Sequence, residues 1–219
     1  MFNINRFRAE IETHGVLRTN TFEAGFPLPE YLRELKSPLG ITEDRMLLRC
    51  ETAQIPGMAW NTLEGVPRIG YGPIEGIPYS PIYDDVTLTF LTDSKGLVHK
   101  LFYTWFNTIV NLQSVGQTAL KDNNRGPTTR AWNPYEVGYR NLYTTILNIF
   151  VYDTAAIAVG ENRGLSDREL ARKKVMTITL FNAYPKLMPS IDMSWSSNDD
   201  VVRLPIPFSY TDFAITYEN

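Results

Sequence analysis

Apolar side chains alternate with threonine or other polar residues in several separate segments, and this period of two constrains the fold more than any other feature of the 219-residue chain. Residues 86–90 have the sequence Val-Thr-Leu-Thr-Phe, residues 176–180 have Met-Thr-Ile-Thr-Leu, and residues 203–210 alternate in the same way. Neighbouring side chains of a strand point to opposite faces, so each segment predicts a strand with one buried face. Three other alternating segments predict further strands, at 46–54, 143–152 and 191–195.

One segment follows a helical period instead. Between Gly96 and Leu112, apolar residues recur every three or four positions, at Val98, Phe102, Trp105, Ile109 and Leu112. Asp93 or Ser94 is well placed to cap this helix. Six or seven strands with one long helix indicate a mainly β fold. We expect an antiparallel β-sandwich or open barrel with one amphipathic α-helix packed against it, plus an N-terminal extension and long loops.

The chain divides into an N-terminal arm, residues 1–45, and a β domain, residues 46–219. Within the β domain, residues 56–81 are so rich in glycine and proline that they can only form loop, turn or edge strand. Residues 113–138 form a long polar loop. Residues 156–174 are an insertion whose short helix begins with a Ser-x-x-Glu capping box.

The arm itself predicts two elements. Ile4, Phe7 and Ile11 recur at helical spacing, and Gly15 would end that helix. Residues 19–29 then form an extended piece closed by prolines. Arms of this kind are often loosely held unless they dock on a neighbour.

Charge and composition exclude several classes of protein. The formal net charge is −3, and the last 40 residues hold two basic and five acidic side chains. No half of the chain is strongly basic, which argues against a protein that grips nucleic acid through its phosphates. No stretch of about 18 apolar residues occurs, so we expect no bilayer-spanning segment. The N-terminus lacks the apolar core of a secretory signal, and the single cysteine, Cys50, cannot form an internal disulfide.

Residues that carry catalysis or bind metals are sparse. The two histidines, His14 and His99, are far apart in the sequence, and we expect both to be solvated or capping. No Cys-x-x-Cys or His-x-x-x-His pair occurs, and Cys50 lies within a strand with no histidine near it in the sequence. The glycines at 70–76 precede no helix that could receive a phosphate, and the acidic loop at 122–126 lacks a calcium-binding glutamate. We therefore expect no enzyme activity, no cofactor and no metal site.

Other classes of function stay open. Exposed tryptophans characterise carbohydrate- or receptor-binding modules, and Trp60 and Trp132 lie in segments that could present them, whereas Trp195 is more simply a core residue. A hydrolase with a site assembled from loops would show a cleft with perturbed titratable groups. The basic cluster at 168–174 (Arg168, Arg172, Lys173 and Lys174) is interleaved with acidic residues and indicates a solvated helix face, or more sharply a subunit contact.

Four segments in order carry a resemblance to a known family. They are RCETAQIPG (49–57), YDDVTLTFLTD (83–93) leading into a helix with FYTWFNTI (102–109), ITLFNAYPKLMPSIDMSWSSND (178–199) and VRLPIPFSYTDFAI (202–215). Together they resemble the tail tube proteins of contractile-tailed bacteriophages and the related baseplate proteins that initiate the tube. The long loop, the insertion and the long arm leave open which of the two this chain is.

The resemblance implies a structural virion protein of the phage tail, made in the host cytoplasm. Members form hexameric rings whose strands join into one barrel around a lumen, and the rings stack into a tube through which DNA passes without specific binding. Tail sheath and baseplate proteins would be partners, and residues 1–45 and 56–81 would bridge to adjacent subunits or rings. Tube proteins of secretion systems share this architecture.

The acidic end of the chain agrees with a lumen that does not retain DNA. We predict that lysine at Asp199 and Asp200 leaves folding intact. If those residues line the lumen, DNA retention in the tube should rise, and unchanged passage would exclude that placement.

Overall fold

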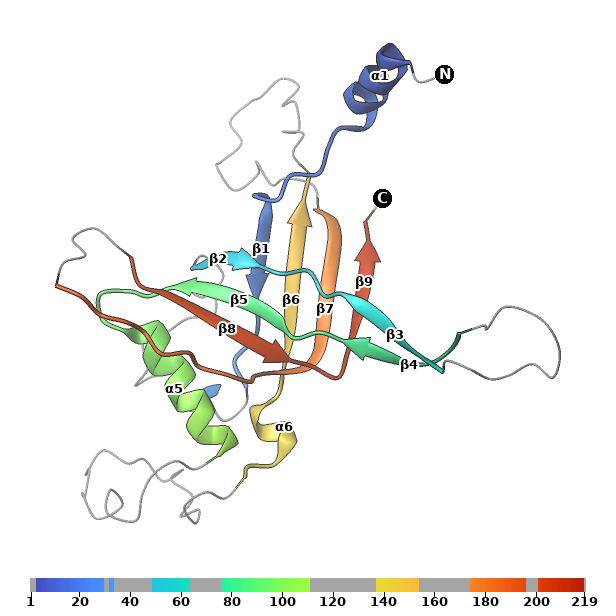
Figure 1. The fold of residues 1–219 in the computed structure, drawn as a ribbon. Coiled ribbons are helices and arrows are strands. Elements are labelled where there is room, and N and C mark those ends of the chain that lie inside the picture. The colour runs from blue at the N-terminus through green and yellow to red at the C-terminus, as the bar shows by residue number, and fades with distance from the viewer. Residues whose placement is uncertain are drawn as a thin grey trace, which may run out of the picture.

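The computed structural model describes residues 3–29, 32–33, 49–63, 76–110, 137–153, 174–195 and 201–218. Nine strands and three helices lie in these ranges (Figure 1). In chain order they are α1 (Ile4–His14), β1 (Phe22–Gly25), β2 (Cys50–Ala53), β3 (Met58–Leu63), β4 (Ile77–Tyr83), β5 (Val86–Leu91), α5 (Leu97–Ile109), α6 (Arg140–Tyr143), β6 (Thr145–Tyr152), β7 (Lys174–Pro185), β8 (Arg203–Ser209) and β9 (Asp212–Tyr217).

The strands form two joined sheets and a separate hairpin, and every strand pair is antiparallel. The first sheet has the order β1-β6-β7-β9, and the second sheet contains β8, β5 and β2. The C-terminal end of β7 joins the two, because Tyr184 and Pro185 pair with β8. The strands of the two sheets cross steeply in Figure 1. The predicted mainly β, open antiparallel architecture is confirmed, and the described strands do not close into a barrel.

The alternation in the sequence places the core between the sheets. Ile149 and Ile178 face it from the first sheet, and Leu88 and Ile206 face it from the second, all fully buried or nearly so. Their polar neighbours along each strand face outward, as a period of two requires. The strand predictions at 86–90 and 176–180 are thereby confirmed. Those at 143–152 and 203–210 are confirmed with shorter bounds, because Tyr143 ends α6, β6 begins at Thr145 and β8 ends at Ser209.

Helix α5 closes one end of the core, as its period predicted. Phe102 and Trp105 are fully buried, and the Trp105 indole N–H donates a hydrogen bond of 2.7 Å to the Tyr143 carbonyl. The Asp93 carboxylate accepts from the Leu97 amide at 2.7 Å, so this residue caps the first turn. The described helix ends at Ile109.

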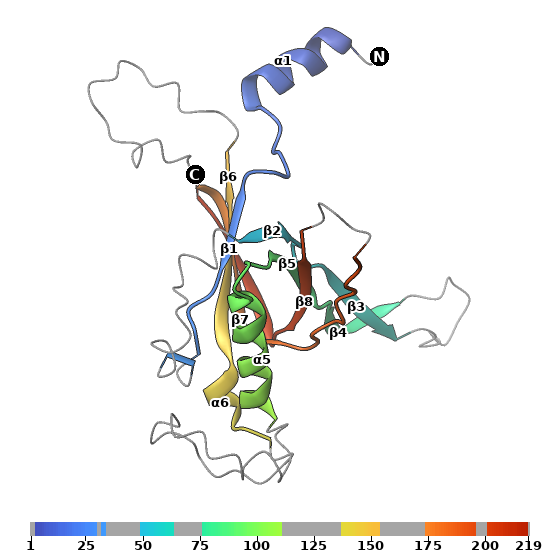
Figure 2. The same cartoon turned by 90° about the vertical axis from the view of Figure 1, so that its left-hand side faces the viewer.

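The first part of the chain divides in the structure between a protruding helix and a strand of the first sheet. α1 forms as predicted and ends at Gly15, whose φ of 71° suits glycine and whose N–H donates to the Ile11 carbonyl. α1 stands away from the sheets in Figures 1 and 2. β1 then pairs with β6, and Ala24 and Phe26 belong to the core. Phe26 lies 5.2 Å from the Trp105 ring centroid.

The glycine- and proline-rich segment contains a two-stranded hairpin. β3 pairs with β4, and neither pairs with another strand among the described residues. The prediction that residues 56–81 contain no helix is confirmed for their described part, 56–63 and 76–81. Most large side chains of the hairpin are exposed, including Met58, Trp60 and Tyr79.

Two predictions near the C-terminus, the strand at 191–195 and the core position of Trp195, are wrong. The segment 191–195 alternates but forms no strand, and Trp195 is 103% exposed rather than buried in the core. β7 ends at Pro185, and the Lys186 amide still donates to the Pro207 carbonyl of β8 at 2.8 Å. Residues 191–195 pair with no strand in the described part of the chain, so alternation alone does not make them a strand. The segment 202–215 forms two strands, β8 and β9, which Tyr210 and Thr211 separate; both run antiparallel to β7 and continue one register along it.

Several predictions concern residues outside the described ranges. They are the capping box at 166–169, the basic residues Arg168, Arg172 and Lys173, Trp132, Asp199 and Asp200, and nearly all of the loop 113–138 and the insertion 156–174. The strand expected at 46–54 is described from Cys50 to Ala53. At the edge of the long loop, Val137 forms an isolated bridge with Val110.

Candidate assembly interface

Both outer strands of the first sheet have one strand neighbour each within the described part of the chain. β1 pairs with β6, and β9 pairs with β7 (Figure 1). The free edge of a strand presents unpaired N–H and C=O groups and is a ready site for pairing with another chain. In the part of the chain that the structure describes, the first sheet therefore has two opposite edges that can accept a partner strand.

Side chains form continuous rows across the four strands of this sheet. Phe22 lies opposite Val151, Val151 opposite Met176, and Met176 opposite Tyr217. Residues directly opposite in antiparallel strands point to the same face. This row therefore faces the core, and so does the neighbouring row that ends in Ile215. Along the outer edge of β9 the apolar row ends in Tyr217, which is 68% exposed.

The opposite face of the first sheet is mainly polar. Three hydrogen bonds link its side chains: Tyr152 to Glu23 at 2.7 Å, Thr179 to Asn148 at 3.0 Å, and Thr177 to Glu218 at 3.3 Å. Burial and the Glu23 carboxylate raise the pKa of Tyr152, so its phenol stays a neutral donor.

The polar face also has a net negative charge. Besides Glu23 and Glu218, Asp212 lies on this face at the start of β9. Within the described ranges its cation is Lys174, whose ammonium lies 4.3 Å above the Phe150 ring. Three carboxylates against one ammonium make this surface a poor site for the phosphates of DNA.

The base of the hairpin contacts the β9 edge through aromatic rings. Tyr83, at the end of β4, lies 6.0 Å from Tyr210 and 5.4 Å from Phe213 between ring centroids. Met58 lies directly opposite Tyr83 in the hairpin and is exposed. Half-buried aromatic rings thus join the hairpin to β9, and the hairpin beyond them exposes apolar side chains, which is typical of a protein contact.

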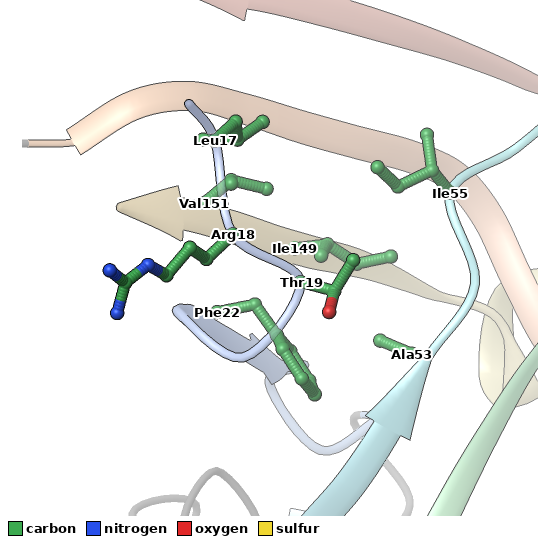
Figure 3. A pocket seen from close by; sticks show the side chains of 8 residues that line it. All are labelled: Leu17, Arg18, Thr19, Phe22, Ala53, Ile55, Ile149 and Val151. Carbon is green, nitrogen blue, oxygen red and sulfur yellow. The ribbon is translucent and has the colours of Figure 1, made fainter. Parts of the chain in front are cut away.

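A pocket lies on the other side of the molecule, between β1 and β2 (Figure 3). These are the outermost strands of the two sheets. The pocket has a volume of about 150 Å³ and is bordered by the segment Arg18–Thr19 and by six apolar side chains: Leu17, Phe22, Ala53, Ile55, Ile149 and Val151. Its lining is therefore largely apolar.

Residues singled out for chemistry in the sequence do not come together. His99 is exposed on α5, and Cys50 lies on β2, where its thiol donates weakly to the Thr52 carbonyl at 3.4 Å. Burial raises the pKa of Cys50 to about 12, so the thiol is not poised as a nucleophile. Among the described residues, no group of three metal-ligating side chains occurs, and no helix is long and apolar enough to span a membrane.

The aromatic residues considered for sugar binding are dispersed. Trp60 is exposed on β3 and Trp195 is exposed after β7. Within the described ranges no aromatic contact joins them. They do not form a common stacking platform there.

The edge at β9 is a feature of the candidate interface that the sequence did not predict. The signal was present, because Phe213, Ile215 and Tyr217 alternate after a break at Ser209–Asp212. The strand predicted from alternation ended at residue 210 and therefore did not include β9.

Comparison with known proteins gives one family and several related folds. The family model described as phage tail tube protein matches residues 17–216. A chain of an extracellular contractile injection system, from a PVC sheath-tube complex in the extended state, has 13% identity and a TM-score of 0.53, covering 96% of this chain and 97% of that one. A chain of the anti-feeding prophage cap, which terminates the AFP tube, has 14% identity and a TM-score of 0.51, covering 93% and 92%.

A third structure, the PVC sheath/tube terminator in the extended state, has 12% identity and a TM-score of 0.51, covering 92% of this chain and 96% of that one. At these identities the likeness concerns the fold. No curated protein matches the sequence.

Proposed function

This chain belongs to the phage tail tube protein family, and on that premise we propose that it is a structural subunit of a hexameric ring that stacks into a tail tube. In this role it performs no catalytic step. The observation that carries the proposal is that the β1 and β9 edges of the first sheet match in their outward backbone groups, in the faces of their side chains and in strand direction.

The hydrogen bonds between β7 and β9 fix which backbone groups face outward. The Glu218 amide donates to the Val175 carbonyl at 2.9 Å. In an antiparallel pair, hydrogen-bonded residues alternate with residues whose N–H and C=O groups point away. The groups of Phe213, Ile215 and Tyr217 therefore point out of the sheet at its β9 edge.

The same rule applies at the β1 edge. The Tyr152 amide donates to the Thr21 carbonyl at 2.9 Å. The N–H and C=O groups of Phe22 and Ala24 therefore point away from β6, out of the opposite edge.

On both edges the residues with outward backbone groups are those whose side chains face the core. When β9 of one copy bonds to β1 of the next, core-facing residues pair with core-facing residues, and the apolar faces of the two sheets become continuous. β1 and β9 also run in opposite directions, because three antiparallel pairings separate them. Pairing between copies is therefore antiparallel too, and the pattern repeats around a closed ring without interruption.

A closed ring of these sheets has the polar face on one side and the second sheet with α5 on the other. We propose that the polar face lines the lumen, because its described hydroxyl, amide and carboxylate groups are accompanied by one cation, Lys174, and not by a strip of cations that would retain DNA. The second sheet, α5 and the protruding segments would then face sheath and baseplate proteins. In this account the protein is part of the virion tail, after synthesis in the host cytoplasm.

We propose that α1 and the β3–β4 hairpin make contacts between subunits or rings. The two elements protrude from the sheets, and the hairpin exposes Met58, Trp60 and Tyr79. The second candidate role is that of the baseplate protein that initiates the tube. Such a protein would form one ring through the same two strand edges, and that ring would stack on baseplate proteins rather than on further copies of itself.

Light-scattering mass and negative-stain electron microscopy of the purified protein test this proposal together. Tubes of uniform width support the stacking subunit, and separate six-membered rings support the initiator. A chain that remains a monomer at high concentration, also when mixed with preformed rings, contradicts both roles.

A further inference from the structure

The pocket between β1 and β2 lies on the same side of the molecule as the free β1 edge. Figure 2 faces this side, with β1 and β2 toward the viewer. Leu17 and Ile55 border the pocket and are each about half exposed, so it opens to the surface. A partner strand that pairs with β1 passes beside this opening.

The size and lining of the pocket select an aromatic side chain as its occupant. An apolar cavity of about 150 Å³ holds one benzene-sized group. In Figure 3 the side chains of Phe22, Ala53 and Ile149 surround the space, and the hydroxyl of Thr19 lies at its border. A phenol ring would bury its apolar body there and place its hydroxyl near a polar group.

We propose that this pocket receives Tyr217 from β9 of a neighbouring copy of the chain. This inference rests on the proposed ring and identifies the side chain that anchors each contact within it.

Three observations single out Tyr217. It belongs to the same cross-strand row as Phe22 and Val151, two of the residues that line the pocket, so it points to the same face of the sheet. It is 68% exposed in the single chain, whereas Phe213 and Ile215, the other core-facing residues of β9, are already half-buried against the core. An exposed aromatic side chain at one edge and an unfilled apolar pocket at the other complement each other between copies.

This contact is heterologous: one copy supplies the tyrosine at its β9 edge and the next supplies the pocket at its β1 edge. Such a contact repeats around a closed ring. It also distinguishes the correct neighbour from any strand that merely offers backbone hydrogen bonds, because only a strand with an aromatic side chain at this level fills the pocket.

A volume-exchange experiment tests the contact in the full-length protein. Mass photometry gives the protein concentration at which half of the chains are in rings. Tyr217→Ala empties the pocket and should raise that concentration at least about tenfold. Tyr217→Phe keeps the aromatic side chain and should change the concentration less than about threefold. Ala53→Phe fills the pocket from within and should also raise the concentration at least about tenfold, because Tyr217 is then excluded.

The double variant shows whether Tyr217 contacts the pocket directly or whether the two single substitutions weaken assembly independently. With Tyr217→Ala and Ala53→Phe together, the new phenyl group occupies the space that the tyrosine has left, and assembly should return to within about threefold of the wild type. Contacting residues show such non-additivity, and independent residues do not.

Matched controls separate the pocket from general damage. Thr52→Phe adds the same ring at the exposed neighbour of Ala53 on β2, and Tyr103→Ala removes an exposed tyrosine from α5. Both should assemble like the wild type. If Ala53→Phe lowers the melting temperature of the monomer, Ile55→Trp at the exposed border of the pocket replaces it.

The possible failures are distinguishable. Wild-type rings with an unaffected Tyr217→Ala variant, or with single effects that simply add in the double variant, overturn the pocket contact and leave the ring. A wild-type chain that forms no rings at any concentration contradicts the proposed ring and the contact with it.

Discussion

At the scale of single residues, Trp105 is the side chain through which α5 is joined to the rest of the core. It is fully buried, stacks on Phe102 with ring centroids 6.2 Å apart, and donates its N–H to the Tyr143 carbonyl. Sequence spacing predicted its burial but not the hydrogen bond, because the acceptor lies 38 positions further along the chain.

The first prediction concerns this hydrogen bond. Trp105→Phe removes the donor, leaves the Tyr143 carbonyl without that partner and opens a small cavity. We expect the free energy of unfolding to fall by about 2–4 kcal/mol, measured by urea denaturation. Trp60→Phe on the exposed hairpin is the control and should change it by less than about 0.5 kcal/mol. Equal effects of the two substitutions would contradict the account of the core.

The second prediction concerns Cys50, whose pKa burial raises from 9.0 to about 12. The thiolate is the reactive form, so a thiol reagent at about pH 8 should label native Cys50 on the order of 1000-fold more slowly than an unfolded control. Because the raised pKa belongs to the folded state, its contribution to stability is complete below pH 9 and is lost as the pH rises toward 12. Labelling of the native protein at the rate of the unfolded control would contradict the burial of the Cys50 thiol.

Trp195 shows why the residue scale is only partly predictable. It alternates with Ile191 and Met193 as a strand residue would, yet it is fully exposed. Trp105 was predicted correctly because a helix forms its own backbone hydrogen bonds locally. A strand needs a partner elsewhere in the chain, and residues 191–195 have no strand partner among the described residues.

At the scale of elements, the proposed assembly depends on the two edge strands, β1 and β9. Strand positions follow from alternation, but the order of strands in a sheet depends on contacts between distant segments. The sequence therefore predicted most strands and could not predict that β1 and β9 are the outer ones. It also assigned the first 45 residues to an arm, whereas Ala24 and Phe26 within them are core residues.

The third prediction uses the alternation of backbone groups at the β9 edge. Amides of Ile215 and Tyr217 point out of the sheet, and those of Ala214 and Thr216 bond to β7. In the monomer the first two should exchange with solvent rapidly and the second two slowly. Ring formation should slow the first pair by at least about tenfold, measured by residue-resolved hydrogen exchange. Unchanged exchange of Ile215 and Tyr217 in assembled rings would exclude pairing at this edge.

At the scale of the whole molecule, the sidedness of the first sheet separates two tasks. One face packs on the core, and the other carries the carboxylates of Glu23, Asp212 and Glu218. Overall acidity of the C-terminal segment was predictable from composition, but the residues that line a lumen depend on which sheet closes the ring. Asp199 and Asp200, proposed from the sequence, lie outside the described residues, and their placement stays a prediction.

The fourth prediction reverses the charge of the polar face. Thr216→Lys with Glu218→Lys should leave ring formation intact and make assembled tubes retain double-stranded DNA, with an affinity that falls steeply as salt rises. The control carries two lysines on exposed positions of α5, His99→Lys with Tyr103→Lys, which the proposal places outside the lumen. DNA protected from nuclease inside the tubes is the measurement. Equal protection by the two variants would contradict the placement of the lumen.

The most direct test of the central claim is a cryo-electron microscopy reconstruction of the assembled protein at a resolution that separates strands. We expect six copies in each ring, with β9 of each copy hydrogen-bonded to β1 of the next and the face of Glu23 and Glu218 turned toward the lumen. A ring in which these two edges stay apart, or in which this face turns outward, would contradict the account.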